Sequence, residues 1–203
     1  MKITPVRYGE TVLPESWIFR DGDPARRRPI SLTVFLIETP GRKILVDAGC
    51  DTMPGFDLTW HEPPPLALKK QTGLSADEIT DVIITHAHHD HIEALRHFKN
   101  AAVWLQVLEF EQGRKHVPAE MKVNLFEEEC TVAEGVRVVR WGGHCPGSSV
   151  VEIGKTVIVG DECYSAECIE KQIPTGASKN PEQSEKFIQN YRDGWKILTC
   201  HDL

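Results

Sequence analysis

Apolar residues along this chain fall into short runs separated by turn-forming residues, a pattern that predicts several β-strands. The clearest case is residues 31–49, SLTVFLIETPGRKILVDAG, in which two β-branched runs flank the turn sequence TPG. A β-hairpin is the expected structure there. The runs Val150–Ile153 and Thr156–Val159, joined by the turn sequence GK, predict a second hairpin. Further strands are expected at residues 81–85, 102–107, 136–140 and 196–199.

Helical patterns lie between these strands. Ser75 and Glu78 have the spacing of a capping box, which predicts a short helix ending near Thr80. Further helices are expected at residues 92–98, 109–116 and 181–191. Residues 53–65 contain four prolines and are expected to form an ordered loop. Paired strands with interleaved helices indicate sheets that are covered by helices on their outer faces.

Length and charge narrow the class of protein. A chain of 203 residues suits a single domain over residues 1–203. The net charge is −7, and the only basic run, Arg26–Arg28, is short, so we expect no nucleic-acid partner. No apolar stretch resembles a signal peptide or a membrane span, so we expect a cytoplasmic protein with no membrane partner. The oligomeric state stays open, with a homodimer among the options.

The densest chemical signal is the segment HAHHDH at residues 86–91, which follows an apolar run. His86 and His88 are two residues apart, so on extended backbone their side chains point the same way. Asp90 and His91 follow where the chain is expected to turn into a helix, and they can face a second point. One short segment can therefore supply ligands to two adjacent metal ions. Imidazole and carboxylate suit zinc, iron, cobalt or manganese.

Three more potential ligands each follow a predicted strand far along the chain. His144 lies in GGHCPGSS, Asp161 in VIVGDE, and His201 directly after ILTC. Alone, such an Asp is more often a turn former and such a His is usually exposed. Their occurrence together with HAHHDH favours a metal site at one edge of a sheet. Seven ligands exceed the four that close a structural zinc site, which favours open, catalytic positions.

A site with two divalent transition-metal ions has a defined chemistry. Two cations lower the pKa of a shared water toward neutrality, and the bridging hydroxide can attack a carbonyl or phosphorus centre without a Ser or Cys nucleophile. Asp90 is close enough in sequence to the ligands to orient that water or receive its proton. We therefore expect a metal-dependent hydrolase that acts on a small-molecule substrate, with zinc as the first choice of metal.

The combination of HxHxDH, GHxPGS, GD and a late His resembles the metallo-β-lactamase-fold hydrolase superfamily, from the VDAG sequence that contains Asp47 to His201. The resemblance implies an α+β fold, a four-layer αβ/βα sandwich of two mixed sheets with helices on the outer faces. It also implies a ligand set: one ion bound by His86, His88 and His144, the other by Asp90, His91 and His201, with Asp161 as the bridge. Asp47 is implied to orient ligands from outside the coordination sphere, although Ala48 replaces the usual Thr.

Within the superfamily the chain looks most like the N-acyl-homoserine-lactone lactonase branch. Gln106 and Glu109 match polar positions of that branch, and Asp161 with Tyr164 repeats its D-x-x-Y pattern. The resemblance implies a catalytic role for Tyr164, whose hydroxyl would polarise a lactone carbonyl, as well as for Asp90. The other interpretation of Tyr164 is a packing residue. The expected reaction is the opening of an ester bond, in the first place in a lactone such as an N-acyl homoserine lactone.

Several residues depart from the pattern of that branch. His89 stands where an aromatic or apolar residue is usual and is expected at the surface, the other interpretation being a proton carrier behind the ligands. Cys145 replaces a Ser or Thr. Four cysteines adjoin the site motifs and are expected to pack beneath the site as buried thiols: Cys50, Cys145, Cys163 and Cys200. A glyoxalase-like thioesterase and a phosphodiesterase share the same ligands and remain alternatives. A metal-binding regulatory module is the non-enzymatic alternative.

Overall fold

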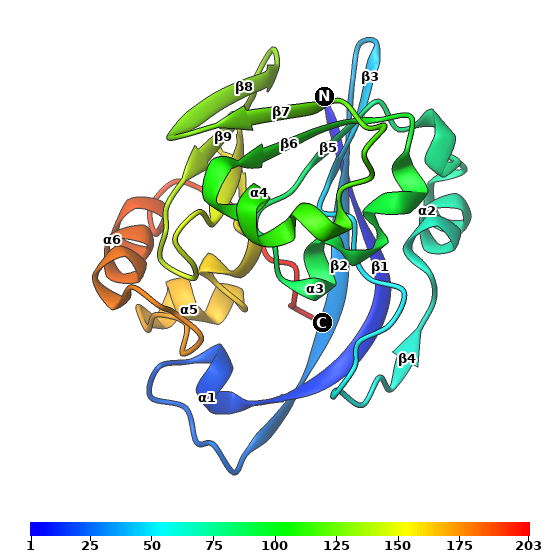
Figure 1. Ribbon diagram of the computed structural model, residues 1–203. Coiled ribbons are helices and arrows are strands. Elements are labelled where there is room, and N and C mark those ends of the chain that lie inside the picture. The colour runs from blue at the N-terminus through cyan, green and yellow to red at the C-terminus, as the bar shows by residue number, and fades with distance from the viewer.

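The computed structural model describes residues 1–203 and contains two β-sheets (Figure 1). The larger sheet has the strand order β4-β1-β2-β3-β5-β6-β7, with β1 Lys2–Pro14, β2 Arg27–Thr39, β3 Arg42–Val46, β4 Trp60–His61, β5 Asp81–Ile83, β6 Ala102–Gln106 and β7 Val123–Phe126. The smaller sheet has the order β12-β11-β10-β9-β8, with β8 Glu129–Ala133, β9 Val136–Arg140, β10 Ser149–Ile153, β11 Thr156–Ile158 and β12 Lys196–Leu198. Both sheets are mixed. In the larger sheet β3, β5, β6 and β7 are parallel to one another and β1, β2 and β3 pair antiparallel. In the smaller sheet β11 and β12 are parallel and the other pairs are antiparallel.

Successive side chains of a strand point to opposite faces of its sheet, so alternate residues belong to different cores. In β2, Phe35 and Ile37 pack with Val151 and Ile158 of the smaller sheet, which forms a core between the sheets. The neighbouring Leu36 packs on the opposite, outer face of the larger sheet. Both faces of β2 are therefore buried, which explains its nearly continuous apolar run.

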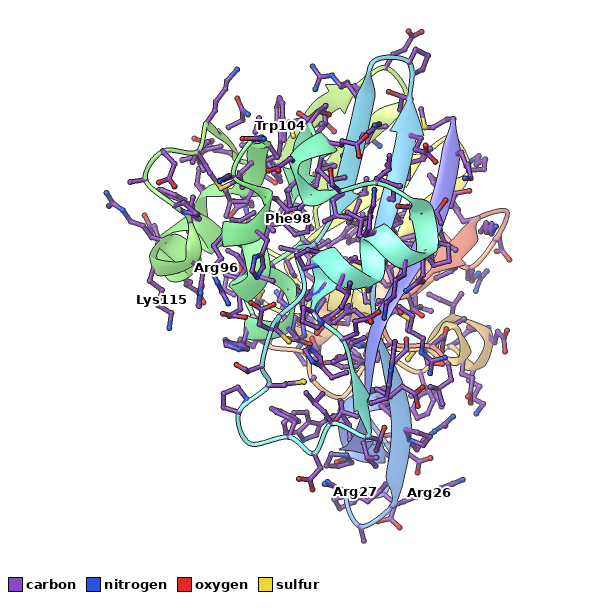
Figure 2. The ribbon with its side chains drawn as sticks, turned by 90° about the vertical axis from the view of Figure 1, so that its right-hand side faces the viewer. Arg26, Arg27, Arg96, Phe98, Trp104 and Lys115 are labelled. Atoms are coloured by element: carbon purple, nitrogen blue, oxygen red, sulfur yellow. The ribbon has the colours of Figure 1, made fainter.

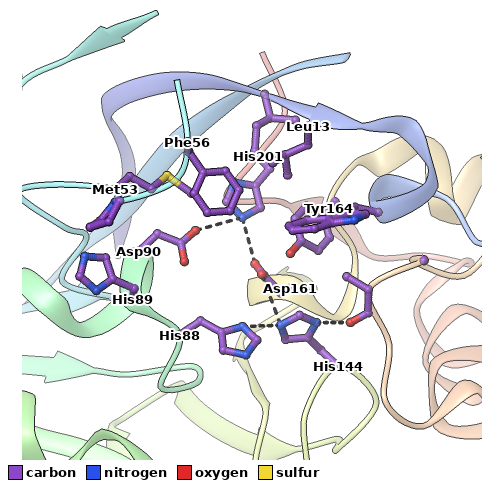
Figure 3. A pocket seen from close by; sticks show the side chains of 15 residues that line it. Leu13, Met53, Phe56, His88, His89, Asp90, His144, Asp161, Tyr164 and His201 are labelled. Carbon is purple, nitrogen blue, oxygen red and sulfur yellow. Dashed lines mark hydrogen bonds and ion pairs between the residues drawn. The ribbon is translucent and has the colours of Figure 1, made fainter. Parts of the chain in front are cut away.

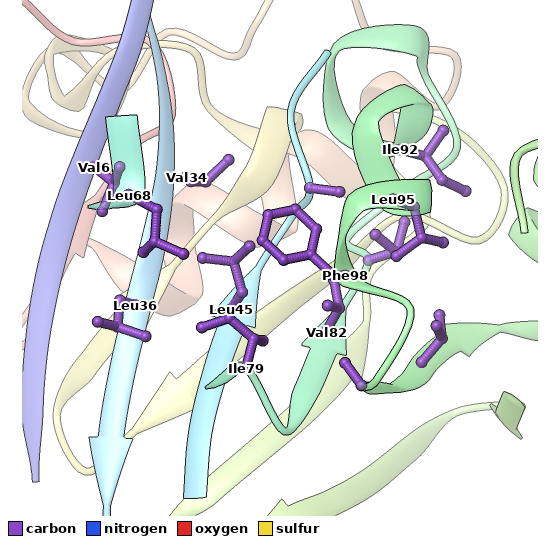
Figure 4. Packing of buried hydrophobic residues seen from close by; sticks show 14 of the residues in the cluster. Val6, Val34, Leu36, Leu45, Leu68, Ile79, Val82, Ile92, Leu95 and Phe98 are labelled. Carbon is purple, nitrogen blue, oxygen red and sulfur yellow. The ribbon is translucent and has the colours of Figure 1, made fainter. Parts of the chain in front are cut away.

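Helices cover the outer face of the larger sheet. They are α2 Pro64–Thr72, α3 His89–Ile92 and α4 Val107–Gly113, with the 3-10 turns η1 Ala76–Glu78, η2 Glu93–Phe98 and η3 Arg114–His116. Figure 4 shows Leu68 of α2 and Phe98 of η2 packed against Leu36 and Val82 of the sheet. This packing holds the segment that contains the HAHHDH motif against the end of β5.

The outer face of the smaller sheet is covered from another part of the chain. The elements are α5 Ala166–Lys171, α6 Pro181–Tyr191, the 3-10 turn η4 Gly160–Glu162 and α1 Glu15–Ile18, which lies in the connection between β1 and β2. Phe187 and Tyr191 of α6 pack against Val150 and Val157 of the sheet. Figure 1 shows α5 and α6 on the side of the molecule opposite α2. The result is the predicted four-layer αβ/βα sandwich.

Both predicted hairpins and the helix at residues 181–191 are confirmed. Three local expectations are wrong. The strand predicted at 81–85 ends at Ile83, and the helix predicted at 92–98 is a 3-10 helix that follows the short α3. In the proline-rich stretch, residues 60–61 pair with β1, and α2 begins at Pro64, because proline is tolerated in the first turn of a helix.

The basic run does not form part of a broad basic face. Figure 2 shows Arg26 and Arg27 at the far end of the hairpin formed by β1 and β2, well away from Arg96 and Lys115. Arg26 and Arg28 pair with Glu15 at 3.3 and 3.7 Å. No helix is long and apolar enough to cross a membrane.

Candidate metal centre

The seven predicted ligands converge at one edge of the two sheets. Figure 3 shows those that line the cavity above the centre: His88, Asp90, His144, Asp161 and His201. Each ligand lies after the end of a strand or in the element that follows it. They converge because the carboxyl ends of β5, β9, β11 and β12 meet at this edge. Five of the seven side chains are buried: His86, His91, His144, Asp161 and His201. His88 and Asp90 are the two that remain partly accessible. Access to the centre is therefore from the side of these two residues.

Three imidazoles form the first ligand group. His88 Nδ1 lies 3.1 Å from His86 Nε2 and 2.8 Å from His144 Nε2. Asp161 Oδ2 lies 3.5 Å from both His86 Nε2 and His144 Nε2. Three nitrogens and one oxygen therefore face a single point, which is the donor set of a tetrahedral zinc site.

The second ligand group consists of Asp90, His91 and His201. His91 Nε2 lies 3.7 Å from Asp90 Oδ2, and His201 Nε2 lies 4.0 Å from the same oxygen. Asp161 Oδ1 lies 3.1 Å from His91 Nε2 and 3.0 Å from His201 Nε2. The two oxygens of Asp161 thus face different groups, as the predicted bridging role requires.

Asp47 orients two of the imidazoles from behind. Its Oδ2 accepts from His91 Nδ1 at 2.8 Å and from the Thr85 hydroxyl at 2.9 Å, and its Oδ1 accepts from the Thr85 backbone N–H at 2.8 Å. The Thr85 hydroxyl in turn lies 3.1 Å from His86 Nδ1. Asp47 has a φ of 61°, a left-handed conformation that Asp and Asn adopt more readily than other non-glycine residues. Such bonds leave Nε2 of both imidazoles free for a metal.

Backbone carbonyls hold two further imidazoles. His144 Nδ1 donates to the Ala177 carbonyl at 2.7 Å, and His201 Nδ1 donates to the Ser31 carbonyl at 2.8 Å. A carbonyl can only accept, so these bonds require the tautomer with hydrogen on Nδ1 whenever the ring is neutral. In both residues the unprotonated Nε2 then faces the centre. Neither carbonyl could be identified from the sequence, because every residue type has one.

The charges of the protein groups indicate that a cation fits the centre. Burial lowers the pKa of His91, but Asp161, Asp47 and Asp90 outweigh it and raise the pKa well above its usual value. Burial also lowers the pKa of His201, but Asp161 and Asp90 outweigh burial and raise this pKa above its usual value. Nε2 of His91 is buried and makes no well-directed hydrogen bond, although Asp161 Oδ1 lies 3.1 Å away. Excess negative charge around such a buried nitrogen is what a divalent cation would relieve.

Fewer carboxylates act on the imidazoles of the first ligand group than on those of the second. Burial lowers the pKa of His86 well below its usual value, with the nearby His91 acting in the same direction. Burial also lowers the pKa of His144 to about 4, with Asp161 opposing the shift. Both imidazoles are therefore neutral at pH 7, which is the protonation state that binds metals.

Two buried glutamates fix the loops that contain the first ligand group. Glu109 accepts from the N–H groups of Ala87 at 2.8 Å and Gly147 at 2.9 Å, so it links the HAHHDH segment to the GGHCPGSS turn. Glu162 accepts from the backbone N–H groups of Gly143 at 3.1 Å and His144 at 3.3 Å. Burial raises the pKa of Glu162 to about 7, although these donors oppose the shift. Gln106 instead caps α4, because its side chain accepts from Leu108 N.

A cavity of about 550 Å³ opens over the centre. His88, Asp90, Asp161 and His201 lie on its floor. Its walls are mostly apolar and include Leu13, Trp17, Ile30, Met53, Phe56 and Ala177. No Lys or Arg lines the cavity. Leu13 and Ile30 come from the ends of β1 and β2 and Trp17 from the connection between these strands. The others come from the proline-rich loop and from the segment before α6, and no sequence motif marks any of them.

Tyr164 and His89 also line this cavity. The Tyr164 ring stacks on His201, with centroids 4.8 Å apart and planes 20° apart, and its hydroxyl points toward Asp161 (Figure 3). Burial raises the pKa of Tyr164 well above its usual value, with Asp161 and Asp90 adding to the shift, so the phenol is a proton donor at neutral pH. His89, expected at the surface, is partly buried and its Nε2 donates to the Thr52 carbonyl at 2.8 Å. It therefore links the proline-rich loop to the metal-ligand segment.

The four cysteines near the site motifs are all buried, as predicted. Cys145 Sγ donates to Glu109 at 3.2 Å, and Cys200 Sγ lies 3.9 Å from Asp47. Burial raises the pKa of Cys50 to about 12. Protonated thiols of this kind pack beneath the ligands rather than compete with them for metal.

The geometry agrees with the chain's likeness to known proteins. Residues 27–188 match the family model of the metallo-β-lactamase superfamily. The N-acyl homoserine lactonase AiiA of Bacillus thuringiensis subsp. kurstaki is 23% identical, over 100% of this chain and 93% of that protein. The structure of an N-acyl homoserine lactone hydrolase with N-hexanoyl-L-homoserine at its catalytic metal centre is similar, with a TM-score of 0.85 and 21% identity over 100% of this chain and 93% of that one. AidC, a dizinc quorum-quenching lactonase, has a TM-score of 0.74 and 17% identity, over 98% and 86% of the two chains.

Proposed function

The chain belongs to the metallo-β-lactamase superfamily of metal-dependent hydrolases, and on that basis we propose that it opens lactones, such as N-acyl homoserine lactones, at a two-metal centre. The observation that carries the proposal is the Asp161 carboxylate, whose two oxygens face two separate ligand groups on the floor of an apolar cavity. The Bacillus thuringiensis lactonases match this chain along its whole length, which supports the choice of substrate.

Each ligand has a proposed assignment. His86, His88 and His144 would hold one divalent ion, Asp90, His91 and His201 would hold the other, and Asp161 would contribute to both. Zinc is the proposed metal because imidazole-rich sites suit it, and iron, cobalt and manganese accept the same donors. When bound, two such ions supply Lewis acidity toward the substrate oxygen and lower the pKa of a shared water.

Two side chains at the cavity floor act on the substrate in this proposal. The Tyr164 hydroxyl donates a hydrogen bond to the lactone carbonyl oxygen, and this bond strengthens as negative charge develops there. Stacking on His201 and burial fix the direction of the phenol. The accessible carboxylate of Asp90 orients the attacking water or accepts its proton.

The cavity wall favours an uncharged substrate with an apolar substituent. Leu13, Trp17 and Ile30 provide apolar contact area, which is how a pocket holds an acyl chain. Two metal ions would pair with the charge of a reacting phosphate, but no Lys or Arg lines the cavity to pair with further negative charges of a nucleic acid. This argues against a phosphodiesterase that acts on a polyanionic substrate. The same absence argues against an anionic thiol carrier, and so against the thioesterase alternative.

The proposal is tested by turnover of a substrate panel with protein loaded with two equivalents of zinc. The panel contains an N-acyl homoserine lactone, an unsubstituted γ-lactone, a thioester of an anionic thiol and a phosphodiester. We expect the N-acyl lactone to have the highest kcat/KM. Hydrolysis of the phosphodiester or thioester, without hydrolysis of any lactone, would refute the proposed substrate class and leave the ligand assignment intact.

A further inference from the structure

Residues 174–177, here called the strap, connect the metal centre to the tip of the hairpin formed by β1 and β2, which is residues 15–26. The Trp17 carbonyl accepts three bonds from the strap: from the Thr175 hydroxyl at 3.0 Å and from the N–H groups of Gly176 and Ala177, both at 3.1 Å. The Pro174 carbonyl accepts from Arg20 N at 2.9 Å. The strap is therefore fastened to the hairpin tip through its main chain and one hydroxyl.

The last residue of the strap also contacts a proposed metal ligand. The Ala177 carbonyl accepts the Nδ1–H of His144 at 2.7 Å. The peptide groups of the strap therefore link the Trp17 carbonyl to the His144 imidazole, which belongs to the first ligand group. Trp17 and Ala177 also line the cavity, so one piece of backbone determines both a wall of the cavity and the direction of a ligand.

The strap passes so close to the hairpin tip that it requires glycine. A Cβ on Gly176 would lie 1.7 Å from the Ser16 carbonyl oxygen and 2.9 Å from the Phe19 carbonyl oxygen. Both obstacles are backbone atoms, which cannot move aside as a flexible side chain could. The φ of Gly176 is not positive, so the requirement is for space and not for an unusual conformation. An added methyl group must push the strap away from the tip.

The two ligand groups differ in what holds their imidazoles. His201 is held by the carbonyl of Ser31 in the middle of the larger sheet, and His91 by Asp47 at the end of β3. His144 is held by the strap, which lies outside any helix or strand. Displacement of the strap therefore affects the first group and leaves the partners of the second group in place.

We infer that the strap is a positioning element for the first metal ion: through the Ala177 carbonyl it fixes the tautomer and direction of His144, and Gly176 makes this possible by its close approach to the hairpin tip. The inference rests on the two-metal centre proposed above. Loss of a hydrogen-bond partner of a metal-ligating His lowers metal affinity by about 10- to 100-fold. We expect a loss of that size at the first position when the strap is displaced, and none at the second.

The test uses two strap variants of the full chain. Gly176→Ala introduces the steric conflict, and we expect about 10- to 100-fold weaker zinc binding at the first position. Thr175→Val removes only a hydroxyl that fastens the strap to the Trp17 carbonyl, with little change of shape. One lost hydrogen bond predicts about a two- to tenfold weaker first site. If Gly176→Ala does not fold, Thr175→Val alone decides the result.

Zinc affinity is measured by competition with a chelator, and the weakened position is identified by anomalous scattering from crystals grown with limiting zinc. Gly154→Ala is the matched control, because Gly154 has a φ of 59° in the remote hairpin between β10 and β11 and open space around it. Gly154→Ala should lower the stability of the fold and retain the zinc affinity of both positions. Trp17→Ala is a second control: it keeps the carbonyl, so it should raise KM and retain both metals.

Two results would overturn the inference while the proposed function stands. In one, both strap variants bind zinc at the first position as tightly as the wild type. In the other, Gly154→Ala loses zinc as readily as Gly176→Ala, which would mean that global stability is responsible. A wild-type protein that binds no metal at the first position would refute the strap inference and the two-metal centre together.

Discussion

Replacement of Asp47 by Asn tests whether this carboxylate prepares the second ligand group for a metal. Asn tolerates the left-handed conformation of Asp47, whose φ is 61°, so the substitution introduces little backbone strain. It replaces one carboxylate oxygen by an NH2 group, which donates and does not accept. The effect should therefore come from the hydrogen bonds alone.

The size of the effect follows from the donors around Asp47. Thr85 N donates to Oδ1 and His91 Nδ1 donates to Oδ2, both at 2.8 Å. Neither donor can become an acceptor while His91 binds a metal through Nε2, so one of them must face the new NH2 group. A hydrogen bond to a charged group contributes about 1.5–3 kcal/mol. Since 1.4 kcal/mol corresponds to about tenfold, we expect roughly 10- to 100-fold weaker binding of the second ion.

The assay is zinc competition with a chelator, with Asp81→Asn as the matched control. Asp81 is also a buried carboxylate of the larger sheet and accepts from Trp104 at 2.9 Å and Arg42 at 3.0 Å, but it makes no contact with the ligands. The control should lose stability and keep both zinc affinities. If Asp47→Asn bound two ions as tightly as the wild type, the role given to Asp47 would be wrong.

Three further predictions concern the same centre. Asp161→Ala should lose both ions and nearly all turnover, because Asp161 faces both ligand groups, whereas His201→Ala should weaken metal binding at one position only. Metal analysis after dialysis distinguishes the two variants. If Asp161→Ala retained two ions, Asp161 would not be a bridging ligand. Tyr164→Phe should keep both ions, and steady-state kinetics should show a kcat for the lactone that is lower by up to about 10²–10³-fold with little change in KM. Full activity of this variant would mean that Tyr164 is a packing residue. The raised pKa of His91 means that this ring holds a proton above its usual range and must release it to bind metal, so zinc affinity should rise with pH until that group is deprotonated. Calorimetry in buffers of different ionisation enthalpy should detect the released proton, and a buffer-independent heat would contradict this.

The ligands could be predicted from the sequence because their chemistry and spacing are local. His86, His88, Asp90 and His91 lie in six residues, and so dense a set of imidazoles and carboxylates is typical of a metal site. The bridging position of Asp161 came from the family resemblance. The geometry of the carboxylate supports it.

The partners that orient the imidazoles could not be predicted in the same way. Ser31 and Ala177 act through main-chain carbonyls, which every residue has, and their role depends on which strand or loop passes behind the ligand. Only the side-chain partner Asp47 left a signal in the sequence. Gly176 is one of 15 glycines, and nothing near it in the chain indicates the close approach to Ser16.

The N-terminal strand and the cavity wall were missed for another physical reason. β1 contains Pro5 and Pro14 and has a register shift between Arg7 and Gly9, so its apolar residues do not alternate regularly. Its pairing with β2 along almost its full length compensates for the weak local signal. This pairing brings Leu13 and Trp17 to the cavity from a segment far from every ligand in the sequence.

The most direct test of the central claim is lactone turnover measured during titration of metal-depleted protein with zinc. Hydrolysis of an N-acyl homoserine lactone can be followed by proton release as zinc is added in fractions of one equivalent. The two-metal account predicts that activity continues to rise beyond one equivalent and reaches a plateau at two ions per chain. A plateau at one equivalent, or no lactone turnover at any zinc content, would contradict it.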